Sequence, residues 1–203
     1  MKPRKKLTAA ERRSQIVTAA TNLFSARGFR GVTTKDLAKA CGVSEPVLYE
    51  HFADKNELYF ALLEEACLDH QDIELKIDEA FASNAAPAEF FLNLAEMIIR
   101  FLDKNPNIFR LILFSALEGH SLAELHFEHR MKPFQAMLMR RIRADIASGA
   151  LRPCDPSVAA RVFIGMINQY FLFDIHFGFA VAKTSRKKVV EGMVNIFLNG
   201  ILK

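Results

Sequence analysis

The stretch VSEPVLYEHF, residues 43–52, concentrates side chains that form directional hydrogen bonds. Hydroxyls and imidazoles can donate or accept, whereas a carboxylate only accepts. The polar side chains in this stretch are those of Ser44, Glu45, Tyr49, Glu50 and His51, with no lysine or arginine among them. Neither a nucleophile–base–acid set nor a glycine-rich phosphate loop is visible in the chain, so we predict no enzyme, no catalytic residues and no cofactor.

Two short helices are expected to position this stretch. TTKD, from Thr33, opens a helix that runs to about Cys41, Gly42 lies at a bend, and Ser44 begins a second helix with Pro46 in its first turn. This spacing is typical of a helix-turn-helix, whose second helix enters the DNA major groove. An ordinary corner between two helices is the alternative. The inward-facing positions are Leu37, Ala38, Val43, Leu48 and Phe52, which leaves Glu45, Pro46, Tyr49 and Glu50 facing outward.

Charge is concentrated at the N-terminal end of the chain. Residues 1–55 hold eleven Lys and Arg against five Asp and Glu, whereas the remainder is slightly acidic. Such asymmetry favours a polyanionic partner, and double-stranded DNA fits the helix-turn-helix. The attraction to DNA would come from the flanking residues, including the arm Lys2–Lys6. It would not come from the second helix of the helix-turn-helix, called here the reading helix.

IVTAATNLFSARGFRGVTTKDLAKACGVSEPVLYEHFADKNEL, residues 16–58, resembles the DNA-binding segment of the TetR-type bacterial transcription regulators. The resemblance extends from residue 9 to about residue 63. The remaining residues resemble the family in being helical and in having a length that suits its regulatory domain. Glu45 and Pro46 stand where family members often carry lysine and glycine, so the resemblance does not imply the usual contacts at those two positions.

The resemblance implies a set of DNA contacts to phosphates and to the groove floor. Hydroxyls and backbone N–H groups at helix starts bind phosphate without a charged side chain. The predicted DNA-binding residues are Thr34, Lys35, Ser44, Glu45, Pro46, Val47, Tyr49, Glu50, His51 and Lys55.

The two glutamates of the reading helix raise a separate hypothesis. A carboxylate can accept a hydrogen bond from cytosine N4 and repels phosphate, so Glu45 or Glu50 would select bases rather than add affinity. The alternative is that both are solvated, or pair with Arg30 or Lys55.

The whole chain is expected to be all-α. Helix-start signals and apolar spacing predict about nine helices and no strand. The first helix is expected to begin at a capping box, Thr8 to Glu11, and to end at Gly28 as a left-handed cap. Ser44 is expected to cap the short third helix, and the fourth helix is expected to run from Asp54 to about Ile77. Residues 1–55 are predicted to form a helix-turn-helix DNA-binding domain with a basic arm, and residues 56–203 a larger helical domain for regulation and dimerisation. Three widely spaced cysteines suit reduced thiols and a cytoplasmic protein.

The segment from about Asp155 to Phe177 is apolar nearly all round. A helix of this kind must be covered on both sides, so one side is expected to face the core and the other a two-fold mate. The last helix, from about Ser185 to Leu202, would complete the homodimer interface. Because Asn168, Gln169 and His176 interrupt the segment, we predict a buried helix rather than a membrane span. A two-fold dimer implies a near-palindromic operator.

The resemblance implies a ligand-responsive regulator, most often a repressor, that is released by a small hydrophobic effector. A buried polar group needs a partner, which makes polar residues in an apolar helix candidates for ligand contacts. The predicted effector-binding residues are Phe109, Phe114, Met137, Met166, Asn168, Gln169, Tyr170 and Phe173. Ordinary core packing and the dimer interface are the alternatives for these residues, and control by a protein partner is the alternative for the regulator.

The segment EGHSLAELHFEHR could supply metal ligands, since His120 and Glu124 lie four residues apart. His126, Glu128 and His129 follow on the same segment. An exposed charged helix face has the same pattern, and we predict no metal site.

Overall fold

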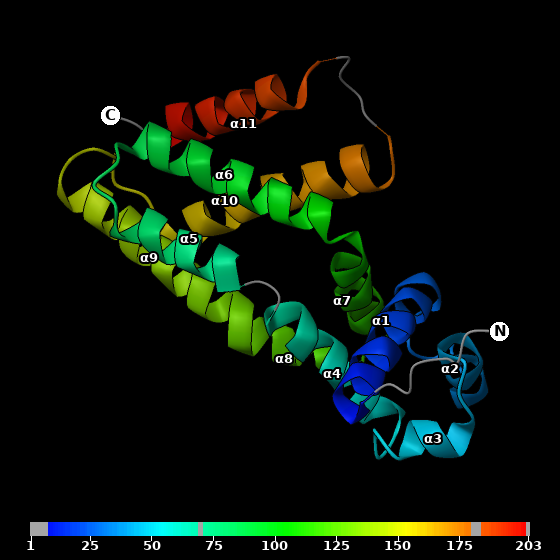
Figure 1. Ribbon diagram of the computed structural model, residues 1–203. Helices are drawn as coiled ribbons and strands as arrows, with labels where there is room; N and C mark the ends of the chain where they lie inside the picture. The colour runs from blue at the N-terminus through cyan, green and yellow to red at the C-terminus, as the bar shows by residue number, and fades with distance from the viewer. Residues whose placement is uncertain (1–7, 69–70, 180–183, 202–203) are drawn as a thin grey trace. The chain divides into compact units, whose positions relative to one another are not determined.

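The computed structural model describes the backbone of residues 8–68, 71–179 and 184–201, and the side chains of these except residues 63–74 and 201. The described chain is built from helices, with no strand in the described ranges (Figure 1). The α-helices are α1 (Ala9–Arg27), α2 (Thr34–Cys41), α3 (Glu45–Tyr49), α4 (Lys55–Leu68), α5 (Gln71–Ala82), α6 (Pro87–Lys104), α7 (Pro106–Glu118), α8 (Ser121–His126), α9 (Lys132–Ala147), α10 (Pro156–Tyr170) and α11 (Arg186–Ile201). Two π-helical turns, η1 (Phe127–Met131) and η2 (Phe171–His176), follow α8 and α10.

The prediction of an all-α chain is confirmed. Because α8, η1 and α9 run on without interruption, as do α10 and η2, the described residues form ten continuous helices rather than about nine. The difference lies in the helix that we expected to run from Asp54 to about Ile77, which the structure describes as α4 and α5. The basic arm Lys2–Lys6 and the side chain of Cys67 lie outside the described residues.

Local hydrogen bonds explain where the helices begin. The hydroxyl of Thr8 accepts from the Glu11 N–H and the Glu11 carboxylate accepts from the Thr8 N–H, which makes a capping box at α1. Thr33 and Asp36 form the same arrangement at α2. The sequence predicted the capping box at Thr8, and at Thr33 it predicted a threonine cap with an acid in the first turn.

Gly28 corrects one prediction about helix ends. We expected a left-handed cap after α1, but Gly28 has φ 71° and ψ 176°, which is positive in φ without being left-handed helical. The chain here turns around the carboxylate of Glu118, since a Cβ on Gly28 would lie 2.2 Å from Glu118 Oε1.

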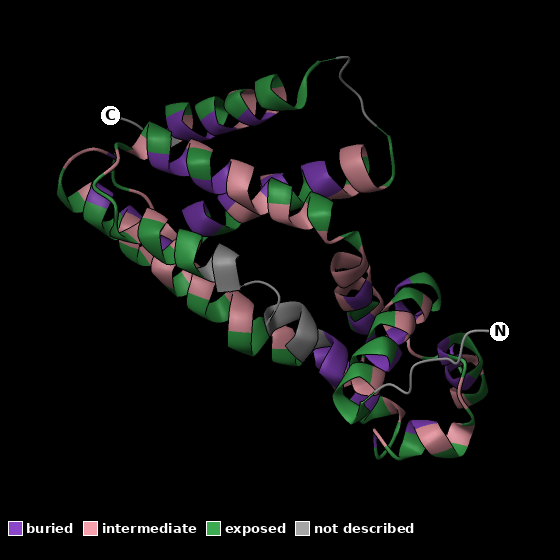
Figure 2. Cartoon of the chain, viewed as in Figure 1, coloured by how far each residue is buried: buried purple, intermediate pink, exposed green. Residues whose placement is uncertain are grey.

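The described residues divide into two compact units, called here the first and second units. The first comprises residues up to 70 together with 107–127, and buried positions occur along its helices (Figure 2). Its core includes Leu111 and Leu122 from α7 and α8 beside Phe24, Leu37 and Leu48 of the N-terminal helices. Residues 107–127 are therefore integral to the hydrophobic core around the helix-turn-helix. The functional boundary between residues 55 and 56 remains a prediction.

The second unit comprises residues 71–106 and 128–203, and its core joins α6, α9, α10 and α11. α10 together with η2, Pro156–His176, is long and apolar enough to cross a membrane by composition alone. Phe163 and Ile167 are nevertheless fully buried in the core, so this helix packs as a core element of its unit.

Candidate nucleic-acid interface

The helix-turn-helix is formed by α2 and α3 around Gly42. Gly42 adopts the left-handed conformation, φ 65° and ψ 33°, which glycine reaches without a Cβ penalty. Across this bend the Val43 N–H donates to the Ala38 carbonyl at 3.0 Å, and Leu37 and Leu48 are buried beneath it. The packed corner holds α3 at a fixed angle to α2.

One side of α3 and its flanks is left to solvent, as the sequence predicted. Ser44, Pro46, Tyr49 and Glu50 are exposed, and Val47 is half-buried. Tyr49 is 47% exposed, so its ring and phenol are accessible from solvent. Ser44 occupies the N-cap position, but its hydroxyl makes no capping bond, which corrects the predicted capping role and leaves the hydroxyl open to another partner.

Glu45 has a partner that the sequence did not indicate. The Thr34 hydroxyl donates to Glu45 Oε2 at 2.8 Å, joining the first residue of α2 to the first residue of α3. The suggested pairing of Glu45 with Arg30 or Lys55 is therefore wrong. Arg30 donates to the Glu118 carbonyl, and the Lys55 ammonium lies over the Phe29 ring.

Arg13 in α1 fastens the far end of the reading helix. Its Nη1 donates to the His51 carbonyl at 2.9 Å, and its guanidinium lies 4.1 Å from the centroid of the Phe52 ring. A guanidinium stacked on an aromatic face is attracted to the ring while keeping its in-plane donors available. Arg13 thus holds His51 and Phe52, at the end of stretch 43–52, against α1.

Lys55 begins α4 and faces an aromatic cluster. Its ammonium lies 4.0 Å from the Phe29 ring centroid, and burial lowers the pKa of the Lys55 ammonium against a smaller opposing effect of Glu118. Tyr59 beside it is fully buried and its hydroxyl donates to the Leu111 carbonyl at 3.2 Å. Burial raises the pKa of the Tyr59 phenol, so it remains a neutral donor. The phosphate contact predicted for Lys55 remains a prediction, and it competes with this aromatic contact.

Glu118, at the end of α7, binds the turn between α1 and α2. Its carboxylate accepts from the Phe29 N–H at 2.9 Å and from the Arg30 N–H at 3.4 Å. The Glu118 carbonyl also accepts from Arg30 Nη2 at 3.1 Å. These bonds attach the end of α7 directly to the chain that leads into the helix-turn-helix.

His120 lies two residues after Glu118 and caps the next helix, α8. Its Nδ1 accepts from the Leu122 N–H at 3.2 Å as the N-cap of α8, and its Nε2 lies 3.3 Å from Asn56 Oδ1. A ring that accepts at Nδ1 and meets a carbonyl oxygen at Nε2 is the neutral form protonated at Nε2. Burial lowers the pKa of His120, Glu118 opposes this effect, and Lys55 adds to it.

The histidine segment does not assemble as the metal alternative would require. Within the described ranges, no group of three or more His, Cys, Asp or Glu side chains is placed to hold a metal ion. His120 serves as a helix cap, and Glu128 pairs with Lys132 at 2.7 Å. Burial lowers the pKa of His126.

The predicted effector residues are distributed over both units. Phe109 and Phe114 belong to the first unit, and the other six belong to the second. Tyr170 is buried and Phe173 is 43% exposed. The half-buried members are Phe109, Phe114, Met137 and Met166.

Asn168 and Gln169 correct part of the effector prediction. We selected them as polar groups buried within an apolar helix, but both are exposed on α10 in the single chain. The reasoning failed because α10 has a solvent side as well as a core side. Val158 and Val162, which are 57% and 53% exposed, are also on α10.

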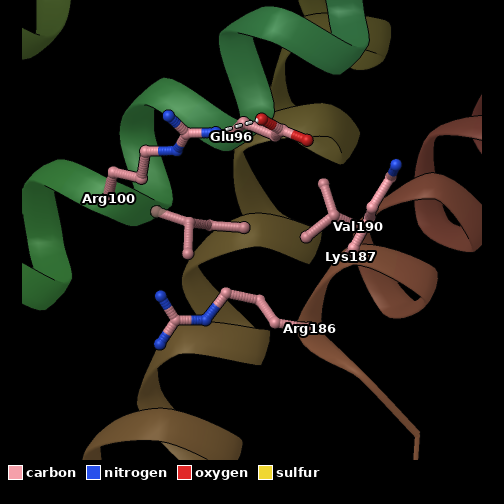
Figure 3. A pocket seen from close by; sticks show the side chains of 6 residues that line it. Glu96, Arg100, Arg186, Lys187 and Val190 are labelled. Carbon is pink, nitrogen blue, oxygen red and sulfur yellow. Dashed lines mark hydrogen bonds and ion pairs between the residues drawn. The ribbon is translucent and has the colours of Figure 1, made fainter.

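A hollow of about 280 Å³ lies between α6 and α11 (Figure 3). Its lining residues are Glu96, Ile99, Arg100, Arg186, Lys187 and Val190, none of which is among the predicted effector residues. Arg100 pairs with Glu96 at 2.6 Å, and Arg186 pairs with Asp103 at 2.9 Å. Lys187 lies 3.7 Å from Glu191, so each cation that lines the hollow has a carboxylate partner.

Two family models match the chain. The bacterial regulatory proteins of the tetR family match residues 16–62, and the C-terminal domain of AefR-like transcriptional repressors matches residues 89–200, more than half of the chain. The chain belongs to the TetR family of transcription regulators. It is accordingly a DNA-binding regulator, and its TetR-family helix-turn-helix is the unit described above.

Relatives of this TetR-family chain are named for different roles. The transcriptional activator FasR of Mycolicibacterium smegmatis is 44% identical over 59 residues, 29% of this chain and 27% of that protein. The nucleoid occlusion factor SlmA of Pasteurella multocida is 32% identical over 120 residues, 58% of this chain and 55% of that protein. The chain thus spans about a quarter and about half of these two relatives.

Solved structures of TetR-family regulators share the fold over nearly the whole chain. AibR in complex with isovaleryl coenzyme A and operator DNA superposes with a TM-score of 0.71 at 22% identity, covering 93% of this chain and 98% of that one. FadR of Bacillus subtilis in complex with stearoyl-CoA gives 0.69 at 19% identity, covering 92% and 98%. PfmR of Thermus thermophilus gives 0.70 at 22% identity, covering 91% and 97%.

Proposed function

We propose that this TetR-family protein is a cytoplasmic, ligand-responsive repressor that leaves its operator when a small hydrophobic effector binds. The observation that carries the proposal is the pairing of a helix-turn-helix with a C-terminal segment that matches AefR-like transcriptional repressors. Repression rather than activation rests on that second match, since the relative FasR is named an activator.

The DNA-binding surface that we propose consists of the exposed side of α3 and its flanks. Ser44 offers an uncapped hydroxyl, Tyr49 an exposed phenol, and Lys35 on α2 an exposed ammonium. Hydroxyl and phenol groups are common donors to phosphate oxygens, and they position a protein on the duplex. Because α3 itself has no cation, long-range attraction would come from flanking Lys and Arg.

We propose that the protein acts as a homodimer through α10 and α11. Val162 on α10 and Ile196 on α11 are 53% and 75% exposed, although buried residues of the same helices form the core of the second unit. Exposed aliphatic side chains on two helices suit a two-fold helical interface, in which each patch meets its own copy. Two reading helices related by a two-fold axis imply a near-palindromic operator.

Acyl thioesters of coenzyme A are the effector class that we would test first. AibR and FadR, which share the fold, were crystallised with isovaleryl coenzyme A and stearoyl-CoA. Within the second unit, the aromatic and sulfur-containing residues predicted for the effector, Met137, Met166 and Phe173, suit contact with an acyl chain. An effector that switches occupancy decisively must discriminate the two protein states by several kcal/mol.

Control by a protein partner is the second candidate. SlmA of Mannheimia succiniciproducens, named a nucleoid occlusion factor, is 27% identical over 82% of this chain and 77% of that protein. The name nucleoid occlusion factor does not refer to a metabolite. It therefore supports, as the second candidate, a regulator that is controlled without a small ligand.

The deciding experiment measures release from DNA. The full chain would be bound to an operator recovered from random duplexes, and acyl-CoA esters of increasing chain length would be added, with free coenzyme A as the control. We expect one range of chain lengths to release the operator while free coenzyme A does not. An operator that no ester releases would overturn acyl-CoA as the effector class and favour the protein-partner candidate.

A further inference from the structure

The start of the reading helix contains a carboxylate held by a neutral donor. The Thr34 hydroxyl donates to Glu45 Oε2 at 2.8 Å, and both side chains are half-buried. No cation forms an ion pair with Glu45 among the described residues. The bond therefore orients the carboxylate without neutralising it.

The Thr34 hydroxyl can donate to only one acceptor at a time. It carries a single hydrogen, and phosphate oxygens only accept, so Thr34 cannot donate to Glu45 and to a phosphate at once. In this structure the Thr34 hydroxyl donates its hydrogen to Glu45. While that bond is present, Thr34 cannot donate to a phosphate as the family resemblance implies. The bond occupies Oε2 and leaves Oε1 of Glu45 able to accept.

A fixed carboxylate discriminates between base edges in the major groove. Guanine and the thymine oxygen present acceptors there, which repel it, and adenine presents its N6 donor beside the N7 acceptor. Cytosine presents the N4 donor with no acceptor on its own edge. Residues at the N-terminal end of a recognition helix are those that reach the bases, and Glu45 is the first residue of α3.

We propose that Thr34 is a positioning residue for Glu45, and that Glu45, oriented in this way, selects cytosine at one position of each operator half-site. The inference rests on the proposed DNA-binding function and specifies which residue reads. Of the two glutamates on this segment, Glu50 is exposed, and its carboxylate has no hydrogen-bond or ionic partner among the described residues, so its side chain lacks the orientation that Glu45 has.

The test is a base-by-base affinity scan of the operator with the full chain. We expect the native protein to prefer cytosine by about tenfold at one position per half-site, within the usual range for a base contact. Glu45→Gln should transfer that preference to adenine, because an amide can bond adenine N6 and N7 together. Thr34→Val, which retains the branched shape but loses the hydroxyl, should reduce the cytosine preference severalfold at the same position alone.

Glu124→Gln is the control, since it removes the same charge from an exposed position on α8 of the first unit, outside the predicted DNA contacts. It should leave the base preferences unchanged. The thermal unfolding midpoint of each variant, measured alongside, separates loss of reading from loss of folding.

Three outcomes would count against the inference in distinguishable ways. Unchanged base preferences in Glu45→Gln would overturn Glu45 as a reader while leaving the DNA-binding function intact. A uniform loss of affinity in Thr34→Val, together with a lower unfolding midpoint, would reduce Thr34 to a structural tie between α2 and α3. Failure of the native protein to enrich any duplex would overturn the proposed function itself.

Discussion

At the scale of single residues, Gly28 and Gly42 have similar φ values of 71° and 65° but opposite surroundings. Nothing lies within 4 Å of where a Cβ would stand on Gly42, whereas Glu118 Oε1 lies 2.2 Å from that point on Gly28. The ψ of 176° at Gly28 also falls in a region that is essentially restricted to glycine.

Gly28→Ala should therefore cost more stability than Gly42→Ala. We expect about 2–4 kcal/mol from backbone strain and displaced Glu118 hydrogen bonds, against roughly 1–2 kcal/mol for alanine in the left-handed conformation at Gly42. Denaturant unfolding of both variants measures the difference. The double variant Gly28→Ala with Glu118→Ala should lose less than the sum of the two single changes, because both act on the same contact. Equal losses in the two glycine variants would contradict the role given to Glu118.

His120 predicts how stability responds to pH. Burial lowers its pKa in the folded state from the ordinary 6.5, so the unfolded chain binds the proton more readily. Its contribution is present above about pH 6.5 and is lost as the pH falls from there towards the folded-state pKa. Burial lowers the pKa of His126 as well, which adds a contribution of the same sign.

We accordingly expect the free energy of unfolding to fall as the pH is lowered through about 6.5, and His120→Asn to make that fall shallower. Asparagine can still cap α8 through its side-chain oxygen but does not titrate. His129→Asn, an exposed change nine residues further on, is the control. A native-like slope in His120→Asn would show that His120 does not cause the pH dependence.

At the scale of helices, the sequence predicted the helix starts and the bend that depend on short-range residue patterns. The capping boxes at Thr8 and Thr33, and the Gly42 bend of the helix-turn-helix, depend on residues within a few positions of one another. Glu118 was missed because its bond to the Phe29 N–H spans 89 positions, and no local spacing marks a glutamate as the partner of a distant turn. The Thr34–Glu45 bond was missed for a related reason, since it joins two helices across a turn.

The effector prediction shows the limit of arguing from the apolar character of a helix. Asn168 and Gln169 were chosen because α10 is apolar on most sides, which would have buried them. The composition predicted a core side and a second side facing a two-fold mate, but it did not tell on which side Asn168 and Gln169 lie. The exposed Val158 and Val162 on that helix fit a dimer interface better than a core.

The proposed dimer interface can be tested by introducing one charged residue on α10. Val162→Glu should convert a dimer to a monomer at micromolar concentration, because two copies of a carboxylate would be buried without partners near the two-fold axis. Light scattering measures the mass directly. Arg140→Glu, an exposed charge reversal on α9, should leave the dimer intact. A dimer that persists in Val162→Glu would place the interface elsewhere.

At the scale of the whole molecule, we expect attraction to DNA and selection among sequences to come from different parts of the chain. Eleven Lys and Arg in residues 1–55 supply charge, whereas the reading stretch 43–52 has none and carries two glutamates. Affinity should thus fall steeply with salt for all duplexes, while the preference among bases should change little, because counterion release does not depend on sequence.

The most direct measurement is selection of duplexes from a random library by the full chain at near-physiological salt. We predict a two-fold symmetric site, with half-sites one helical turn or more apart and a fixed cytosine in each half. Enrichment of no site, or of a site without two-fold symmetry, would contradict the central claim that this is a dimeric, operator-reading regulator.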